Sequence, residues 1–145
     1  MTSPSYTSGA APTFGAPYLL RPHRPGDIGR EACWIAERDG VNVGSVFLVQ
    51  ARDEATHRPV EGVAQLRLLL VEPSARGLGL GKRLVEQCER FARPAGYRKI
   101  VLSTHAKLLT ARGLYGAAGY VLTNRAPHHS FGHDLVGETW ERVLA

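Results

Sequence analysis

The sequence is poor in cysteine: Cys33 and Cys88 are the only two among 145 residues, and they form no C-x-x-C motif. Both lie among apolar residues, which predicts buried, reduced thiols of a cytoplasmic protein rather than a disulfide framework. A nucleophilic cysteine is a weaker alternative, because neither has a candidate base nearby in sequence. No apolar run approaches the ~20 residues of a membrane span, and the N-terminus lacks a basic patch before an apolar core. We therefore expect a soluble protein without a membrane partner.

Basic runs are also missing, although the formal net charge is +5 and the pI is near 9.6. The arginines and lysines are scattered, with no aromatic ladder among them, so anion binding at one site is favoured over nucleic-acid binding. The length suits one domain that folds without disulfides or a metal. Residues 1–17 are rich in Ser, Thr, Pro, Gly and Ala and predict a flexible N-terminal arm, and residues 18–145 predict the domain.

One glycine-rich stretch is the best evidence for function, and it reads Arg76-Gly77-Leu78-Gly79-Leu80-Gly81-Lys82. It follows an apolar run, Leu66–Val71, that predicts a buried strand ended by Pro73. After it, Leu80, Leu84, Cys88 and Phe91 fall on one stripe of a predicted helix. An anion at that helix N-terminus would meet free N–H groups, the positive end of the helix dipole, and two basic side chains. Glycine-rich turns also join strands to helices for packing reasons alone, so the glycines need context.

Two other phosphate-binding motifs do not fit this stretch. A P-loop needs four residues between its first glycine and Gly-Lys, followed by Ser or Thr, whereas Arg83 follows Lys82 here. A dinucleotide fingerprint needs G-x-G-x-x-G at the first strand-to-helix turn, whereas these glycines alternate and lie past the middle of the chain.

The remaining pattern predicts a meander of strands, then the turn, then strands and a second helix. Gly44 marks a bulge or a close backbone approach in the third strand, and Ala51–Glu61 is expected to be a loop. The expected strands are Tyr18–Arg21, Cys33–Glu37, Val43–Gln50, Val63–Val71, Lys99–Ser103, Tyr120–Arg125 and Thr139–Leu144, and the expected second helix is Leu108–Ala118.

The turn matches the R-x-x-G-x-G motif of the GNAT N-acetyltransferases through Arg76, Gly79 and Gly81, and the chain resembles that family from about Tyr18 to its end. The resemblance is closest to acetyltransferase domains fused behind MarR-type DNA-binding domains, through residues 20–27, 33–40, 67–73 and 127–137. It implies an α/β (α+β) fold: a mixed, mostly antiparallel sheet with a central splayed strand pair and flanking helices.

The resemblance also implies a function and residue roles. The chain would transfer an acetyl group from acetyl-CoA, without a metal, to a small-molecule or protein amine. The turn 76–82 would hold the pyrophosphate, the backbone of Leu69, Leu70 and Val71 would pair with the pantetheine, and Tyr115 would protonate the departing thiolate. A tyrosine on an apolar helix stripe is otherwise usually a core residue. His105 stands where related members usually carry an asparagine.

The sequence departs from the family between Arg21 and Cys33, where most members carry two helices that form the acceptor side of the site. About a dozen residues are too few for two helices. We expect an exposed sheet face or altered groove there, covered by a second copy of the chain in a homodimer. The alternative function is an acyl-CoA-binding regulatory or interaction module with little turnover.

The chain also contains three histidines in six residues, His128, His129 and His133, in a segment expected to be a loop. With no cysteine nearby, a loop near the acceptor amine is favoured over a zinc site. No general base is identifiable: Glu72, Glu61 and His129 are all possible, and each also reads as an ordinary surface residue.

Overall fold

The computed structural model describes residues 18–23, 30–130 and 132–144. The predicted N-terminal arm, residues 1–17, lies outside this range. Within the described chain, no helix is long and apolar enough to cross a membrane. The elements are β1 (Leu19–His23), β2 (Ala32–Arg38), β3 (Val41–Arg52), β4 (Pro59–Val71), the short 3-10 helix η2 (Pro73–Ala75), α1 (Leu80–Ala92), β5 (Lys99–His105), α2 (Leu109–Ala117), β6 (Val121–Ser130) and β7 (His133–Val143).

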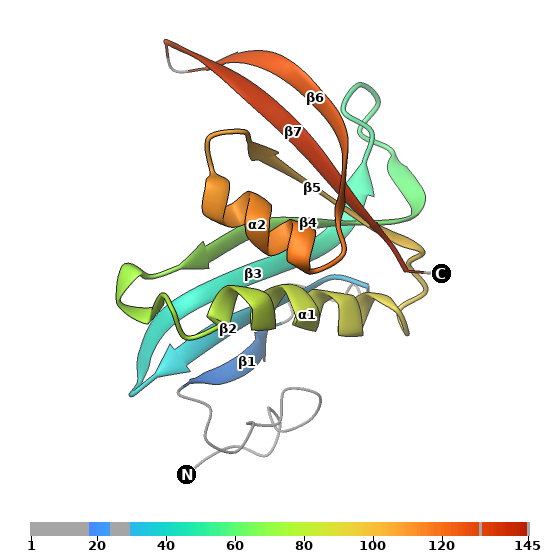
Figure 1. The fold of residues 1–145 in the computed structure, drawn as a ribbon. Coiled ribbons are helices and arrows are strands. Elements are labelled where there is room, and N and C mark those ends of the chain that lie inside the picture. Colours follow the sequence, from blue (N-terminus) through green and yellow to red (C-terminus); the bar gives the residue numbers. More distant parts are fainter. Residues whose placement is uncertain (1–17, 24–29, 131, 145) are drawn as a thin grey trace.

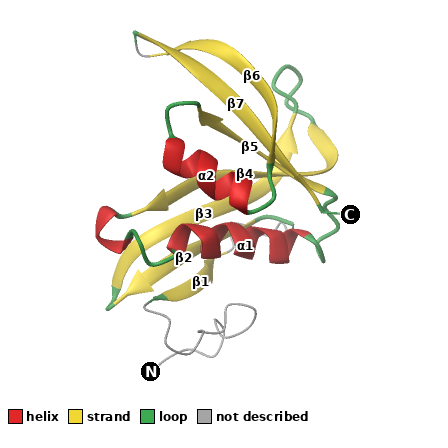
Figure 2. Ribbon diagram, in the orientation of Figure 1, coloured by secondary structure: helices red, strands yellow, loops and turns green. Residues whose placement is uncertain are grey.

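The strands form one seven-stranded sheet in the order β1-β2-β3-β4-β5-β7-β6 (Figures 1 and 2). Every neighbouring pair is antiparallel except β4 and β5, which run parallel because α1 forms the crossover between them. The expected mixed, mostly antiparallel sheet with flanking helices is therefore confirmed.

The two central strands separate soon after they pair. Their ladder covers only Val63–Gln65 of β4 against Lys99–Val101 of β5. Beyond it, β4 continues to pair with β3 and β5 continues to pair with β7. The edges of β4 and β5 that face each other are open from Leu66 and Leu102 onward, which confirms the predicted splay.

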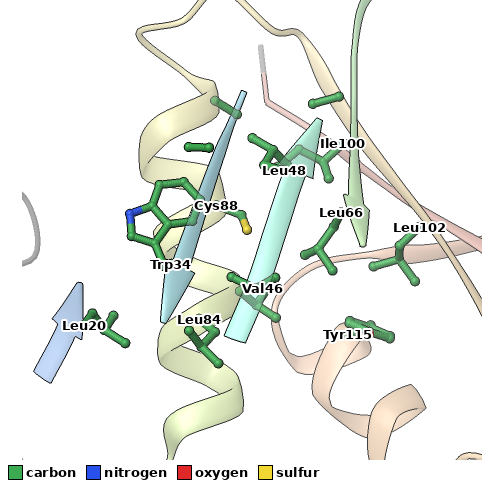
Figure 3. Packing of buried hydrophobic residues seen from close by; sticks show 14 of the residues in the cluster. Leu20, Trp34, Val46, Leu48, Leu66, Leu84, Cys88, Ile100, Leu102 and Tyr115 are labelled. Carbon is green, nitrogen blue, oxygen red and sulfur yellow. The ribbon is translucent and has the colours of Figure 1, made fainter. Parts of the chain in front are cut away.

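Both helices pack on the same face of the sheet, over one apolar core (Figure 3). Leu84 and Cys88 of α1 are fully buried against the strand residues Val46 and Leu66, and Tyr115 of α2 joins the same cluster. Fully burying a side chain of leucine size stabilises the fold by roughly 1.5–3 kcal/mol. Gly44 lies under α1, where an added Cβ would lie 2.8 Å from Leu80 Cδ2, so the close approach expected there is present. The ladder between β2 and β3 also shifts register beside it.

Only residues 24–31 separate β1 from β2, and residues 24–29 lie outside the described part of the chain. The end of this link is tied to the body of the protein: Arg30 Nε donates to the Ala95 carbonyl (3.1 Å), and the Tyr97 hydroxyl donates to the Arg30 carbonyl (2.7 Å). The Arg30 guanidinium also lies over the Tyr97 ring at 4.4 Å. Two predictions concern this segment and stay predictions. One is the lack of two helices between the strands, and the other is a homodimer that covers the gap.

Two expected loops are shorter than predicted. The segment with the three histidines belongs to a long hairpin, because β6 and β7 pair from Val121 to Ser130 with one register shift between Leu122 and Asn124. Figure 1 shows this hairpin projecting beyond the end of β5. Pro127 is compatible with this strand, because β6 is the edge strand, where a proline needs no ladder partner on its outer side. Likewise β3 and β4 extend to Arg52 and Pro59, so the loop that joins them is residues 53–58.

Candidate active-site clefts

The splay of β4 and β5 opens into two adjoining clefts. The first, of about 750 Å³, lies beside the glycine-rich turn and is called here the turn cleft. The second, of about 780 Å³, lies along the divergence of the strands and is called the sheet cleft. Leu69, Leu108 and Ala111 line both clefts, so a ligand in one can reach a ligand in the other.

The turn cleft is shaped by glycines that cannot easily be replaced. Gly77 and Gly79 have φ of +84° and +73°, a backbone conformation that L side chains rarely adopt, and an added Cβ would have no neighbour within 4 Å. Because glycine has no side chain, the backbone of the turn stays uncovered at Gly77 and Gly79, where it faces open space. Gly81 lies close to α2 instead, because a Cβ there would lie 3.1 Å from Leu114 Cδ2, which would have to shift slightly.

The charge of the turn cleft suits an anion. Arg76, Lys82 and Lys107 line it, and no acidic residue of the described chain does. Gly79 is the N-cap of α1, no side chain caps the helix, and its first turn holds no acidic residue. The first N–H groups and the positive end of the helix dipole therefore lie beside the three cations.

The open edge of β4 forms the wall between the clefts. Leu69 lines both clefts and Val71 lines the turn cleft, while the Leu70 side chain is 61% exposed and lines neither. Leu78 and Leu80 pack against the core, so these two can contact a ligand chiefly through their backbone. The structure thus brings the predicted stretches 69–71 and 76–82 together along one cleft.

A β-bulge interrupts β4 at this wall. Ser45 and Phe47 of β3 oppose Leu70 and Arg67 of β4, so β4 carries one extra residue. Leu68, within the bulge, has a φ of +54°, which costs of order 1 kcal/mol or more for a non-glycine residue. The bulge leaves the backbone of Leu68 and Leu69 out of register with β3, where its polar groups can pair with a ligand instead.

Tyr115 lies in the wall of the sheet cleft, on α2, and is only 6% exposed. Burial, followed by the charge of Cys88, raises the pKa of its hydroxyl above the ordinary value of 10.0. The hydroxyl therefore stays protonated at neutral pH and can donate a proton. The Tyr120 ring packs against it at 5.9 Å between centroids.

A buried carboxylate, Glu138 of β7, holds α2 against the sheet. It accepts hydrogen bonds from Arg112 Nε (2.9 Å), Arg125 Nη2 (2.8 Å) and Trp140 Nε1 (3.0 Å). Burial raises the pKa of Glu138, but the hydrogen bonds from Arg125, Trp140 and Arg112 together outweigh it, and the net pKa is lowered. Because Arg112 lies one turn before Tyr115, this ionised carboxylate orients the helix that carries the tyrosine.

None of the three candidate bases lines either cleft. Glu72 and Glu61 are exposed at the two ends of β4, and His129 pairs with Asp134 (2.8 Å) on the exposed hairpin. His105 does line the sheet cleft, at the end of β5. The side chains of His128 and His133 lie outside the described set, and no group of three or more potential metal ligands occurs among the residues that are described.

Sequence reasoning missed the polar residues that the sheet cleft gathers. Their only signal was the placement of polar residues between buried ones, such as Arg67 within the apolar run of β4. Besides His105 and Tyr115, these residues are Glu54, Gln65, Arg67, Ser103, Thr104, Asn124, Glu138 and Thr139.

The chain resembles several curated acetyltransferases. It is 38% identical to human N-acetyltransferase 8B over 96 residues, which are 66% of this chain and 41% of that protein. It is 36% identical to mycothiol acetyltransferase of Cellulomonas flavigena over 91 residues, which are 61% of this chain and 26% of that protein. The match thus spans well under half the length of these relatives.

Solved structures share the fold. The Salmonella typhimurium protein yncA, solved with its cofactor acetyl-CoA, superposes with a TM-score of 0.70 and 20% identity, over 79% of this chain and 65% of that one. A ribosomal-protein-alanine N-acetyltransferase from Brucella melitensis superposes with a TM-score of 0.69 and 21% identity, over 79% of this chain and 69% of that one. The model of the acetyltransferase (GNAT) family matches residues 7–120. The chain therefore belongs to the acetyltransferase (GNAT) family.

Proposed function

We propose that the protein transfers an acetyl group from acetyl-CoA to an amine. The observation that carries the proposal is the meeting of two different clefts at Leu69: a cationic one built on a glycine turn, and a polar one that holds a buried tyrosine. A phosphate-bearing donor suits the first, and an amine acceptor suits the second.

The turn cleft fits the donor on three grounds. Its glycines leave space that a Cβ would fill, its lining is cationic, and the adjacent edge of β4 has no strand partner. The backbone of residues 76–82 would hold the pyrophosphate, with Arg76 and Lys82 adding charge. The open backbone of Leu69, Leu70 and Val71 would pair with the amides of pantetheine as another strand would.

The reaction needs a C–N bond to form and a C–S bond to break. Acetyl-CoA supplies a thioester carbonyl carbon, which the neutral amine attacks, so that the electron pair of the C–S bond leaves on sulfur. Tyr115 donates its proton to that sulfur, and the amine loses a proton to water, since no base is assigned. The raised pKa of Tyr115 keeps the proton available until this step.

Two measurements test the proposal. Calorimetric titration with acetyl-CoA should show binding, and mass spectrometry of a broad amine panel should show products heavier by one acetyl group. A folded protein that does not bind acetyl-CoA would contradict the proposal. Binding without transfer to any amine would favour the alternative of an acyl-CoA-binding regulatory module.

Two finer predictions extend this proposal. The first is that the chain resembles, in particular, acetyltransferase domains fused behind MarR-type DNA-binding domains, through residues 20–27, 33–40, 67–73 and 127–137. A homodimer covering the gap between β1 and β2 is expected to appear in analytical ultracentrifugation of the purified chain.

A further inference from the structure

The face of the sheet away from the helices is polar where it lines the sheet cleft. Gln65 and Arg67 alternate with the buried Ala64 and Leu66, so they point away from α1 and α2. By the same alternation Ser103 and Thr139 point to that face. An acceptor approaching from this side therefore meets polar groups rather than an apolar pocket.

Arg67 is the unusual member of this group. It lies within an interior strand, directly before the bulge at Leu68, and its side chain is exposed to the sheet cleft. No ion-pair or hydrogen-bond partner for its guanidinium occurs among the described residues. A guanidinium has a planar fork of donors that matches a carboxylate in two parallel hydrogen bonds.

The opposite charge comes from Glu54, in the loop between β3 and β4. Two hydrogen bonds hold the turn in that loop: Asp53 Oδ1 accepts from the backbone N–H groups of Ala55 (2.9 Å) and Thr56 (3.0 Å). Glu54 lines the same cleft as Arg67, and it too has no ion-pair partner in the part of the chain that is described. Apart from Glu138, whose charge is balanced by Arg112 and Arg125, the described lining of the cleft therefore presents one cation and one anion without an ion-pair partner.

We propose that the acceptor is an amine that also carries a carboxylate, as an amino acid does, and that Arg67 binds this carboxylate. Glu54 attracts the ammonium group into the cleft before it loses its proton. Because Arg67 directly precedes the bulge beside Leu69, a carboxylate held there leaves a nearby amine facing the junction of the two clefts. This inference rests on the proposed acetyl transfer and specifies its acceptor.

The test compares amino acids with their α-carboxamides, which keep the amine and replace the carboxylate by a neutral group of similar shape. The pairs are phenylalanine, methionine, glutamate and lysine with their amides, and acetylation is followed by mass spectrometry. The wild-type protein should acetylate at least one acid with a kcat/KM roughly 10-fold or more above that of its amide. Equal or better acetylation of all the amides would overturn the inference.

Variants separate the two charges. Arg67→Met should lower kcat/KM for the acids by roughly 10- to 100-fold and leave the amides and the affinity for acetyl-CoA nearly unchanged. Glu54→Gln should lower kcat/KM for the acids and for the amides by a similar factor, because both kinds of acceptor carry the amine. Arg38→Met, which makes the same charge change at the exposed end of β2, is the control and should keep the preference. If Arg67→Met keeps the full preference for acids over amides, the inference is overturned.

Two further measurements keep the test decisive. If Arg67→Met does not fold, Arg67→Lys keeps the charge without the planar fork and should lose part of the preference. If no amine is acetylated, calorimetry of the same acids and amides with the CoA-bound protein decides. Selective binding of acids that Arg67→Met abolishes would support the inference although the proposed function fails, and the lack of selective binding would overturn it.

Discussion

The two clefts are built in different ways. The turn cleft takes most of its lining from one continuous stretch, from Leu69 to Lys82, while the sheet cleft takes polar residues from five separate segments, among them the β3–β4 loop and the β6–β7 hairpin. A contiguous stretch keeps its geometry through local backbone rules. A site assembled from distant segments depends on register and on how far the strands diverge.

The largest effect is expected at the turn. Gly79→Glu should weaken acetyl-CoA binding by ~100-fold or more, equivalent to ~3 kcal/mol, because it adds strain at a φ of +73° and an anion where a phosphate would bind. Gly40→Glu is a matched control in the β2–β3 turn, with a φ of +80° and the same open space. Calorimetry should show normal affinity for that control. If both variants lose the same affinity for acetyl-CoA, strain alone explains the effect and the turn is not a phosphate site.

In the sheet cleft, Tyr115→Phe should lower turnover by ~100-fold or more and leave acetyl-CoA affinity nearly unchanged, because only the proton donor is removed. Tyr120→Phe removes a buried hydroxyl from the ring packed against Tyr115 and should keep turnover. Steady-state kinetics and calorimetry on both variants check this. An unchanged rate in Tyr115→Phe would reduce this residue to a packing role.

A smaller effect should separate the two arginines bound to Glu138. Arg112 lies on α2, with Tyr115, whereas Arg125 lies on β6. Arg112→Gln should lower kcat by roughly 10-fold through a misplaced tyrosine, with KM for acetyl-CoA little changed. Arg125→Gln should lower the free energy of unfolding by about as much as Arg112→Gln does, and should keep kcat near the wild-type value. Equal kcat in the two variants at matched stability would show that Glu138 does not orient the tyrosine.

The smallest effect concerns stability against pH. The pKa of Glu138 is lower in the folded state than its ordinary value of 4.5, so its contribution is fully present above pH 4.5 and is lost as the pH falls through the folded-state pKa. The free energy of unfolding of Glu138→Gln should therefore fall less steeply than that of wild type below pH 4.5. Urea titrations across this range measure both slopes, and parallel slopes would contradict the prediction.

The parts of the fold that were predictable rest on short-range patterns. The strand Val63–Val71, the turn and α1 follow one another in a chain segment whose apolar run, glycines and 3.6-residue stripe each predict one element. The two last strands were predicted, but the segment that joins them was wrongly expected to be a loop from residue 126 to 138, whereas β6 and β7 continue through most of it. This segment is extended because β6 pairs with β7, and β7 in turn pairs with β5.

The sequence by itself determined the family resemblance, the glycine turn and the placement of Tyr115 on a helix, because these depend on residues close in the chain. The bulge at Leu68 carries no glycine or other signal, and it follows from the register of β4 against β3. The meeting of Glu54, Arg67 and Thr139 in one cleft was likewise decided only in three dimensions. The reason is physical: strand register and the divergence of β4 from β5 are set by packing across the whole sheet.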